Sequence, residues 1–375
     1  MSTFPNQKHN TPVIKLNQPD DNYKFQPLPK PSGEYPYHFC ADQFLSTDSQ
    51  ELVFHMVGDT GGRLNPDFQK KVAAEMARQF GDASQEQGVP QFLYHLGDVV
   101  YHFGEAQHYD EQFFIPYGKY PAPIFAIAGN HDSDVNPNSG VPYQSLDPFQ
   151  AVFCNAVSDN ISFNSDQTWK SRTQPNIFWT LETPLVNIIG LHTNVPKYGI
   201  VTSEQRDWFV EELRAADKQR PDKAIIVCLH HAPYSADFNH SSSLPMITFL
   251  EEAFAKSGVR PDIVFSGHVH NYQRFEKSYP DGKLLPFIVA GAGGFDELHA
   301  LARIDQEAYS AEHPLLKDVV LMNYCDNQHG FLKIILNRQA VGLTLTGEYY
   351  TIPHEIDPEG RATLADKFTY TFGGK

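Results

Sequence analysis

Five short polar clusters in the sequence contain residue types that bind metal ions. In chain order they are GDTGG with Asp59, GDVVY with Asp98 and Tyr101, GNHD with Asn130 and His131, HHAPY with His230 and His231, and GHVH with His268 and His270. Carboxylate, phenol, amide and imidazole groups supply the oxygen and nitrogen ligands that borderline metal ions prefer. One such cluster is usually only a turn or a surface histidine, but the complete ordered set predicts a metal centre.

Two metal ions fit this set better than one. A carboxylate such as Asp98 can bridge two cations, and two ions about 4 Å apart can clamp the attacking and leaving oxygens of an in-line displacement. His268 and His270 project to the same side if their segment is extended, so each can bind a different ion of a close pair. The glycine before Asp59, Asp98 and His268 predicts a sharp turn from strand to loop at each position.

Short apolar runs precede the clusters and predict buried strands. These runs are LVFHMV at 52–57, FLYHL at 92–96, PIFAIA at 123–128, VNIIGL at 186–191, AIIVCL at 224–229, IVFS at 263–266 and PFIVA at 286–290. In open α/β sheets, ligands bind beyond the carboxyl ends of the strands. We therefore expect the polar clusters that follow these runs to converge in space.

Helix signals separate several of these runs, which predicts an α/β class with a second sheet. Asn-Pro at 65–66 is typical of a helix start, Thr202 with Gln205 predicts a capping box, and a third helix is expected over 245–254. The segment GFLKIILNRQAVGLTLTGEYY predicts two strands joined by a turn near 337–338.

The chain divides into two parts by composition. Residues 1–50 are rich in proline and predict an extended N-terminal arm, and residues 51–375 predict a single catalytic domain. Residues 135–175 and 296–326 have the composition of inserted loops. Such loops either shape a pocket or elaborate the surface, and the sequence leaves both readings open.

Charge and composition exclude several classes of function. The net charge is -16, and no basic run could follow a nucleic-acid backbone, so nucleic acid is not an expected partner. The four cysteines form no CxxC pair, which excludes a zinc ribbon or thioredoxin motif. No apolar stretch reaches membrane-spanning length, and the first residues have no secretory pattern, so we expect a cytoplasmic protein without a membrane partner.

The ordered set GDxGG, GDxxY, GNHD, HxP and GHxH resembles the calcineurin-like metallophosphoesterase superfamily and, within it, the purple acid phosphatases. The phrases GHVHNYQR and VAGAGG belong to the same resemblance, which covers about residues 51–350. It implies an α/β protein with the metallophosphoesterase-type α/β/β/α sandwich of two packed mixed β-sheets flanked by helices. Relatives with the tyrosine of GDxxY are mostly exported, so export is an alternative to the cytoplasm.

The resemblance also implies two sets of metal ligands. The first ion, an iron, would be bound by Asp59, Tyr101, His270 and bridging Asp98, and the second, a zinc, manganese or iron ion, by Asn130, His231, His268 and Asp98. The family's ligand precedes any residue and then proline, which selects His231 over His230. His230 is then expected to be packed or hydrogen-bonded, with a catalytic role as the alternative.

Tyr101 distinguishes the purple branch from the rest of the superfamily. Most members have Asp-x-His at the first motif, whereas this chain has Gly61 where that histidine would stand. A phenolate is a hard anionic ligand that favours trivalent iron. The alternative is that Tyr101 is a packed aromatic after a turn.

The activity that the resemblance implies is acid phosphatase-like hydrolysis of small phosphate monoesters by a metal-activated hydroxide. His131 and His240 would hold the phosphoryl oxygens or protonate the leaving group. His240 lies nine residues after His231, as a substrate-pocket histidine does in short, mammalian-type members, and its alternative is a solvated loop residue. The rival functions are a phosphodiesterase with two divalent metals and a non-catalytic binding protein.

Overall fold

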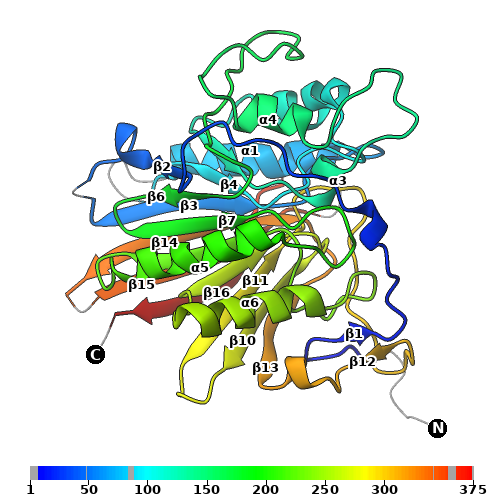
Figure 1. The fold of residues 1–375 in the computed structure, drawn as a ribbon, viewed down its shortest axis with the longest axis vertical. Coiled ribbons are helices and arrows are strands. Elements are labelled where there is room, and N and C mark those ends of the chain that lie inside the picture. Colours follow the sequence, from blue (N-terminus) through cyan, green and yellow to red (C-terminus); the bar gives the residue numbers. More distant parts are fainter. Residues whose placement is uncertain (1–6, 48, 83–87, 341, 354–359, 374–375) are drawn as a thin grey trace.

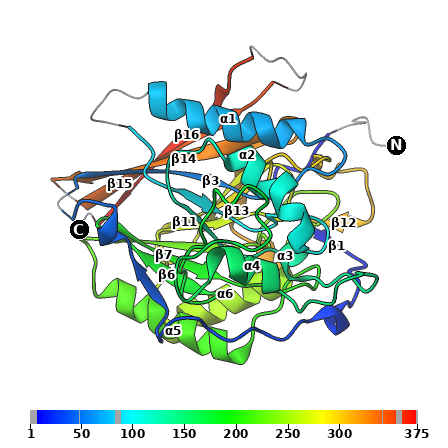
Figure 2. The same ribbon diagram turned by 90° about the horizontal axis from the view of Figure 1, so that it is seen from above.

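The computed structural model describes residues 7–47, 49–82, 88–340, 342–353 and 360–373. Within these ranges the chain forms two large mixed β-sheets with helices on their outer faces (Figures 1 and 2). Fully buried side chains on both sheets, such as Phe54, Ile226 and Ile334, belong to one hydrophobic core. The predicted α/β/β/α sandwich is confirmed.

The eight-stranded sheet contains the strands that precede the HHAPY and GHVH clusters. Its order is β13 (Val319–Cys325), β10 (Tyr272–Ser278), β11 (Leu284–Ala290), β9 (Ile263–Ser266), β8 (Ala224–Leu229), β7 (Val186–Leu191), β6 (Trp179–Glu182) and β2 (His38–Cys40). Its central strands β7, β8, β9 and β11 are parallel. All side chains of β7 and β8 are buried, as expected for strands covered on both faces.

The six-stranded sheet contains the strands that precede the other three clusters. Its order is β16 (Thr363–Phe372), β15 (Gly342–Thr351), β14 (Gly330–Gln339), β3 (Glu51–Val57), β4 (Leu93–His95) and β5 (Ile124–Ala126). Strands β3, β4 and β5 run parallel, so their carboxyl ends lie at one edge. A separate two-stranded sheet pairs β1 (Ile14–Lys15) with β12 (Tyr309–Ser310).

Helices cover both outer faces of the sandwich. They are α1 (Asp67–Asp82), α2 (Ile115–Tyr117), α3 (Asn130–Ser133), α4 (Asp147–Phe153), α5 (Ser203–Asp217) and α6 (Leu244–Ser257). Figure 2 shows α1 on the side of the six-stranded sheet, opposite α5 and α6. Thr202 caps α5 by accepting a hydrogen bond from Gln205 N at 3.3 Å, as predicted. None of the described helices has the length and apolar character needed to cross a membrane.

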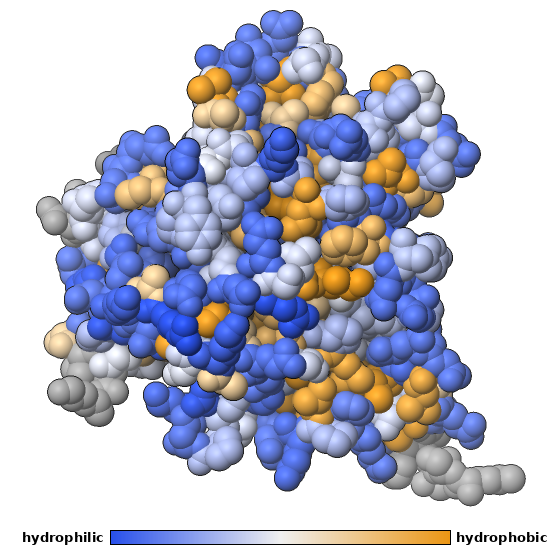
Figure 3. All heavy atoms as spheres, viewed as in Figure 1, coloured by the Kyte–Doolittle hydropathy of each residue, from blue (hydrophilic) through white to orange (hydrophobic). Residues whose placement is uncertain are grey.

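Several short helical turns complete the architecture. They are η1 (Asn22–Lys24), η2 (Ala41–Gln43), η3 (Ala106–His108), η4 (Asp110–Phe114) and η5 (Pro314–Leu316). The molecular face in Figure 3 is mostly hydrophilic, with apolar side chains gathered in several patches.

Three expectations about turns and loops are corrected by the structure. The turn expected near 337–338 lies instead between β14 and β15, because Gly342 adopts the left-handed conformation (φ 95°) that closes the hairpin. The segment 296–326 is not a loop throughout, because 319–325 alternates between buried and exposed side chains and forms β13. The segment 135–175 likewise contains the short helix α4.

The described part of the N-terminal arm, residues 7–47, lies along the surface in mostly extended conformation. It crosses the face of the molecule seen in Figure 1, where it is drawn in dark blue. Val13 N donates to Ser235 O at 2.9 Å, and Gln26 N donates to Asn194 Oδ1 at 2.9 Å. The arm is therefore hydrogen-bonded to loops that follow β8 and β7.

Candidate metal centre

The five polar clusters converge where the carboxyl ends of strands from both sheets meet. GDTGG, GDVVY and GNHD follow β3, β4 and β5, and HHAPY and GHVH follow β8 and β9. Backbone hydrogen bonds join the turns: Asp59 N donates to Gly97 O at 3.0 Å, and Gly267 N donates to His230 O at 3.0 Å. The predicted convergence is confirmed.

The sharp turns fall on the polar residues rather than only on the glycines before them. Asp59, Asp98 and His268 have φ values of 58°, 54° and 67°, a region that L residues adopt at a cost. Gly267 is needed for a different reason: a Cβ there would lie 2.6 Å from Asp59 Oδ2. The glycine expectation therefore holds at Gly97, which has a φ of 96°, whereas at Gly267 close approach selects the glycine and the positive φ lies on His268.

Asp59, Tyr101 and His270, here called the Tyr101 group, bring three polar atoms together. The Tyr101 hydroxyl lies 3.3 Å from Asp59 Oδ1 and 3.4 Å from His270 Nε2, and the latter two atoms are 3.7 Å apart. Ligand atoms that share one ion at about 2.1 Å lie about 3 to 3.5 Å from one another. The spacing suits a shared cation.

Tyr101 is held in place by its neighbours. Gln112 clamps its backbone, accepting from Tyr101 N at 2.8 Å and donating to Tyr101 O at 3.0 Å, and its ring stacks on Phe295 with 4.0 Å between centroids. A Cβ at Gly61 would lie 2.9 Å from Tyr101 Cδ2. The Tyr101 ring therefore lies directly beside residue 61, which explains why that residue is glycine.

The other side of the candidate metal centre is formed by a second set of side chains, here called the Asn130 group: Asn130, His230, His231 and His268. His268 Nε2 donates to the carbonyl oxygen of Lys197 at 3.1 Å, which leaves the lone pair of Nδ1 facing Asn130 Oδ1 at 2.9 Å. Two acceptors at this distance repel each other unless a cation lies between them. This contact is the clearest sign in the structure that these residues fit a metal ion.

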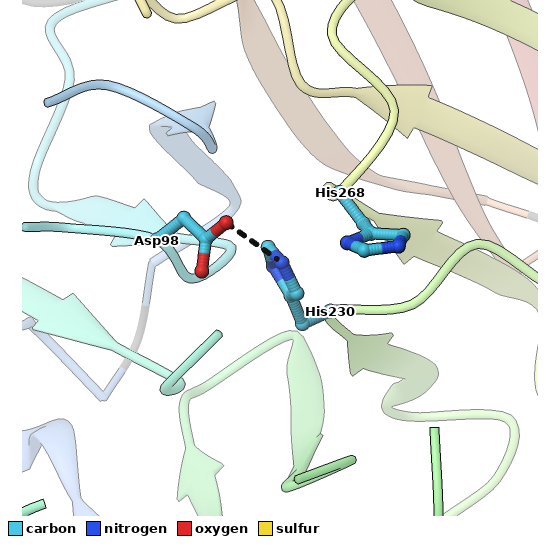
Figure 4. Close-up of side chains that lie close together, drawn as sticks. All are labelled: Asp98, His230 and His268. Atoms are coloured by element: carbon cyan, nitrogen blue, oxygen red, sulfur yellow. Dashed lines mark ion pairs between the residues drawn. The ribbon is translucent and has the colours of Figure 1, made fainter. Parts of the chain in front are cut away.

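His230 also reaches this side, although sequence reasoning set it aside as packed or hydrogen-bonded. Its Nδ1 donates to Leu96 O at 2.8 Å, and its Nε2 lies 3.3 Å from Asp98 Oδ2 and 3.1 Å from Asn130 Oδ1. Figure 4 shows Asp98, His230 and His268 around one space, and one ligand atom of each lies within 4.8 Å of the others. His230 is thus fully hydrogen-bonded and also adjacent to the candidate metal site.

His231, the predicted ligand, has one nitrogen paired and one unpaired. Its Nδ1 lies 2.7 Å from Thr193 Oγ1, and its buried Nε2 has no hydrogen-bond partner among the described residues. Asp98 Oδ2 is a second buried atom without a hydrogen-bond partner there, although it pairs electrostatically with His230. Buried polar atoms without partners are costly, so both are consistent with metal ligands.

Hydrogen bonds to residues around the site orient His270 and the turns that carry Asp98 and Asn130. His270 Nδ1 donates to Glu297 O at 3.1 Å, which leaves Nε2 for the Tyr101 group. Asp132 joins two of the turns, accepting from Val99 N at 3.0 Å and Gly129 N at 2.8 Å. The turns that carry Asp98 and Asn130 therefore form one rigid unit.

Burial sets the charge states of these groups. It raises the pKa of the Asp59 carboxyl, and with the charges of Asp98 and Asp59 it raises the pKa of the Tyr101 hydroxyl. Burial also lowers the pKa of His231, His268 and His270, which favours the neutral imidazole that binds metals. His230 differs: burial lowers its pKa, but the charges of Asp98 and Asp59 outweigh burial and raise the pKa to about 9, so its imidazolium balances one of these carboxylates. A phenolate at Tyr101 would require a further cation.

The two predicted catalytic histidines border the cluster. His131 N donates to Asp98 Oδ1 at 2.9 Å, and its Nδ1 donates to His102 O at 2.8 Å. The ring of His240 lies 4.0 Å from that of His268, between centroids. His240 Nδ1 is buried without a hydrogen-bond partner in the described part of the chain, so this residue is packed against the site rather than free in solvent.

Sequence reasoning missed two further neighbours of the cluster. The ring of His299 stacks on His270 at 4.4 Å, and Phe295 stacks on Tyr101. Both lie in the segment after VAGAGG, where no periodic pattern marks them. Their place shortly after that phrase was the only signal in the sequence.

Comparisons with known proteins agree with this arrangement. Residues 52–272 match the model of the family described as calcineurin-like phosphoesterase. Purple acid phosphatase 18 of Arabidopsis thaliana is 32% identical over 186 residues, 46% of this chain and 36% of that protein. Fe(3+)-Zn(2+) purple acid phosphatase 12 of the same organism is 26% identical over 159 residues, 41% of this chain and 30% of that protein.

A solved structure described as PhoD superposes with a TM-score of 0.53 at 11% identity, covering 92% of this chain and 72% of that one. This likeness concerns the fold. The chain spans about a third of the length of the curated relatives that it matches. Because the family model covers more than half of the sequence, the chain belongs to the calcineurin-like phosphoesterase family.

Proposed function

We propose that this protein hydrolyses small phosphate monoesters with the help of two metal ions. The observation that supports this most is the pair of acceptors Asn130 Oδ1 and His268 Nδ1, 2.9 Å apart, beside the compact Tyr101 group. Each side offers one ion a set of oxygen and nitrogen ligands. The similarity to purple acid phosphatases supports the same reaction class.

The proposed ligands divide between the two sides. Asp59, Tyr101 and His270 hold the first ion, and Asn130, His231 and His268 hold the second. Asp98 is assigned as the bridging ligand, since its charge acts on Tyr101 on one side and one of its oxygens lies within 4.8 Å of a ring nitrogen of His268 on the other. Ions bound there would supply positive charge and lower the pKa of water.

The proposed metals are iron in the Tyr101 group and zinc, manganese or iron in the Asn130 group. A phenol is a hard oxygen ligand, and the name of the similar Fe(3+)-Zn(2+) enzyme supports this pairing. The imidazoles and the amide of the second side suit a divalent ion. A small phosphate ester is the proposed substrate.

The protein's own side chains would bind and orient the ester. His131 is fixed through its Nδ1 to His102 O, which leaves its Nε2 to hold a phosphoryl oxygen. His240, packed against His268, is placed on the other side to hold an oxygen or give a proton to the leaving group. Both residues would act beside the metal ligands without being ligands.

A direct test compares a chromogenic phosphomonoester with the matching diester on purified, metal-analysed protein. We expect two metal ions per chain, one of them iron, and a kcat/KM at least about tenfold higher for the monoester. Preference for the diester with two divalent ions would instead favour a phosphodiesterase. Hydrolysis of neither ester by fully metallated protein would favour the non-catalytic binding protein.

A further inference from the structure

A short hydrogen-bonded chain of side chains leads away from the candidate metal centre. It begins at His299, whose ring stacks on His270 at 4.4 Å and whose backbone N donates to His270 O at 3.0 Å. His299 Nε2 lies 3.2 Å from Asn239 Nδ2, and Asn239 Oδ1 lies 3.3 Å from the ammonium of Lys197. The chain therefore connects the Tyr101 group to a cation.

The donor and acceptor roles in this chain are mutually consistent. The ammonium can only donate, so it fixes Oδ1 of Asn239 as the acceptor and turns Nδ2 toward His299. His299 Nε2 then accepts, and its proton sits on Nδ1, which faces the buried Asp237 Oδ2 at 3.7 Å. The side chain of Lys197 is thus held at a defined place rather than extended freely into solvent.

Asp237 fixes the loop that carries Asn239. Its Oδ1 accepts from Asn239 N at 2.7 Å and from His240 N at 2.6 Å. Its carboxylate is fully buried, and burial raises its pKa to about 7. It is therefore enclosed behind the loop, although its charge still acts on the ammonium of Lys197.

Lys197 borders the metal centre through its backbone and acts on it through its charge. Its carbonyl oxygen accepts the hydrogen bond from His268 Nε2 at 3.1 Å. Burial, and after it the charge of Lys197, lowers the pKa of His299 to about 4. Among the described residues, the ammonium has one hydrogen-bond partner, so two of its three protons remain for a ligand.

The N-terminal arm adds to the positive charge at this position. Asp21 of the arm accepts from Lys197 N at 3.1 Å, and Lys15 N donates to Ser241 Oγ at 3.2 Å, next to His240. The charges of Lys15 and Lys24 both act on Lys197, although Asp21 offsets Lys24 through an ion pair of 3.3 Å. The negative charges of Asp237 and Asp21 also act on Lys197, so the arm adds Lys15 as the cation that no carboxylate in the described part of the arm offsets.

We propose that Lys197, held by Asn239 and His299, forms a subsite for a second anionic group of the substrate, a carboxylate or a phosphate. This inference rests on the proposed phosphomonoesterase function. The phosphate ester at the metal centre would occupy one end of the site, and the second anion would pair with the ammonium of Lys197 and the free amide proton of Asn239. Substrates with two anionic groups would then be preferred over matched substrates with one.

The test uses three substrates that share one carbon skeleton. Glycerol 3-phosphate has no second anion, 3-phosphoglycerate has a carboxylate, and glycerol 1,3-bisphosphate has a second phosphate. We measure kcat/KM for phosphate release from each by the metal-loaded full chain. The kcat/KM of the wild-type protein for 3-phosphoglycerate or for glycerol 1,3-bisphosphate should exceed that for glycerol 3-phosphate by about tenfold or more. A charge-assisted hydrogen bond to the second anion would give a difference of this size.

Variants then assign the preference to Lys197. Lys197→Gln should lower the preference ratio about tenfold, Lys197→Arg should retain most of it, and Lys218→Gln, at the exposed end of α5, should leave all three rates unchanged. Metal content and melting temperature of each variant confirm folding. Whichever substrate loses its advantage in Lys197→Gln identifies the second group as carboxylate or phosphate.

Two results would overturn the inference while leaving the proposed function intact. The first is equal kcat/KM for all three substrates in the wild type, and the second is an equal loss on all three in Lys197→Gln. Failure of the metal-loaded wild type to release phosphate from any of the three would overturn the proposed function and this inference with it.

Discussion

The Tyr101 group and the Asn130 group form two sides of one candidate centre, but they are built differently. The Tyr101 group has one histidine, and its three atoms lie 3.3 to 3.7 Å apart. The Asn130 group has three histidines, of which His230 is hydrogen-bonded through both nitrogens and His231 through one. The Tyr101 group offers a metal ion one set of three ligand atoms, whereas the Asn130 group offers more nitrogen atoms than one ion needs.

The difference has a structural cause. Each member of the Tyr101 group comes from a different motif, after β3, β4 and β9, and neighbouring side chains such as Phe295 and Gln112 fix the ring of Tyr101. His230 and His231 are adjacent at the end of β8, so they leave the backbone in different directions and approach the Asn130 group from two sides.

Asp98→Asn should have the largest effect, because Asp98 is the residue proposed to serve both sides. An amide keeps the shape but removes the charge that two cations need, so we expect loss of metal from both groups and a fall in kcat/KM of at least about 10³-fold. Elemental analysis and steady-state kinetics measure both. Asp305→Asn, at an exposed ion pair, is the matched control. Two bound metals and near-normal turnover in Asp98→Asn would show that the bridging assignment is wrong.

The choice between His230 and His231 is the next largest test. His231→Ala should remove one metal per chain and lower kcat/KM about 10²-fold, because its buried Nε2 has no hydrogen-bond partner in the described ranges and can bind the ion. His230→Ala should keep two metals and lower metal affinity about tenfold, since both of its nitrogens already have protein partners. Metal titration of the two variants decides the matter. Loss of one metal only in His230→Ala would reverse the assignment.

Tyr101→Phe probes the other side with a smaller expected effect. The oxidised wild type should be coloured by phenolate-to-iron charge transfer, and the variant should lose this visible absorption and about tenfold in kcat/KM. The ring is fully buried and stacked on Phe295, so phenylalanine should preserve the packing and the melting temperature. Unchanged absorption in the variant would mean that Tyr101 is only a packed aromatic. A colourless wild type with two divalent ions would favour the phosphodiesterase.

Much of this arrangement could be predicted from the sequence, because the signals were local. The runs 186–191 and 224–229 are strands with those bounds, since continuous apolar residues suit strands buried on both faces. Thr202 caps α5 as its sequence pattern predicts. The Tyr101 group was implied by the family resemblance, and the structure brings its three side chains together.

Other features depend on tertiary contacts that no local pattern encodes. The sequence did not predict β16, which has several exposed polar side chains and is stabilised by pairing with β15. The approach of His230 to Asp98 depends on a contact between the two sheets, where His230 Nδ1 donates to Leu96 O directly after β4. His299 and Lys197 lie in loops without periodicity, and a single hydrogen-bonded chain brings them together.

His38 gives the smallest predicted effect and a contrast with the histidines of the site. Burial lowers the pKa of His231, His268 and His270, whereas His38 on β2 lies 2.8 Å from both Glu182 and Glu212. Hydrogen bonds to these two carboxylates raise the pKa of His38 to about 9. The imidazole is therefore neutral at His231, His268 and His270, and it is charged at His38 on the edge of the eight-stranded sheet.

The sign of the resulting pH dependence follows from linkage. A histidine with a pKa of about 6.5 unfolded and about 9 folded binds its proton more tightly in the folded protein. Its contribution to the free energy of unfolding is complete below pH 6.5 and is lost as the pH rises through 9. Solvent reaches His38, so the contribution should be about 1 kcal/mol or less.

We expect the difference in unfolding free energy between wild type and His38→Gln to shrink between pH 6.5 and 9.5 in denaturant titrations. Taking the difference cancels contributions common to both proteins, those of the metal centre included. Glu182→Gln should move the midpoint of this loss to lower pH, because it removes one of the two carboxylates. A difference that stays constant over the whole pH range would show that the two ion pairs do not hold a proton on His38.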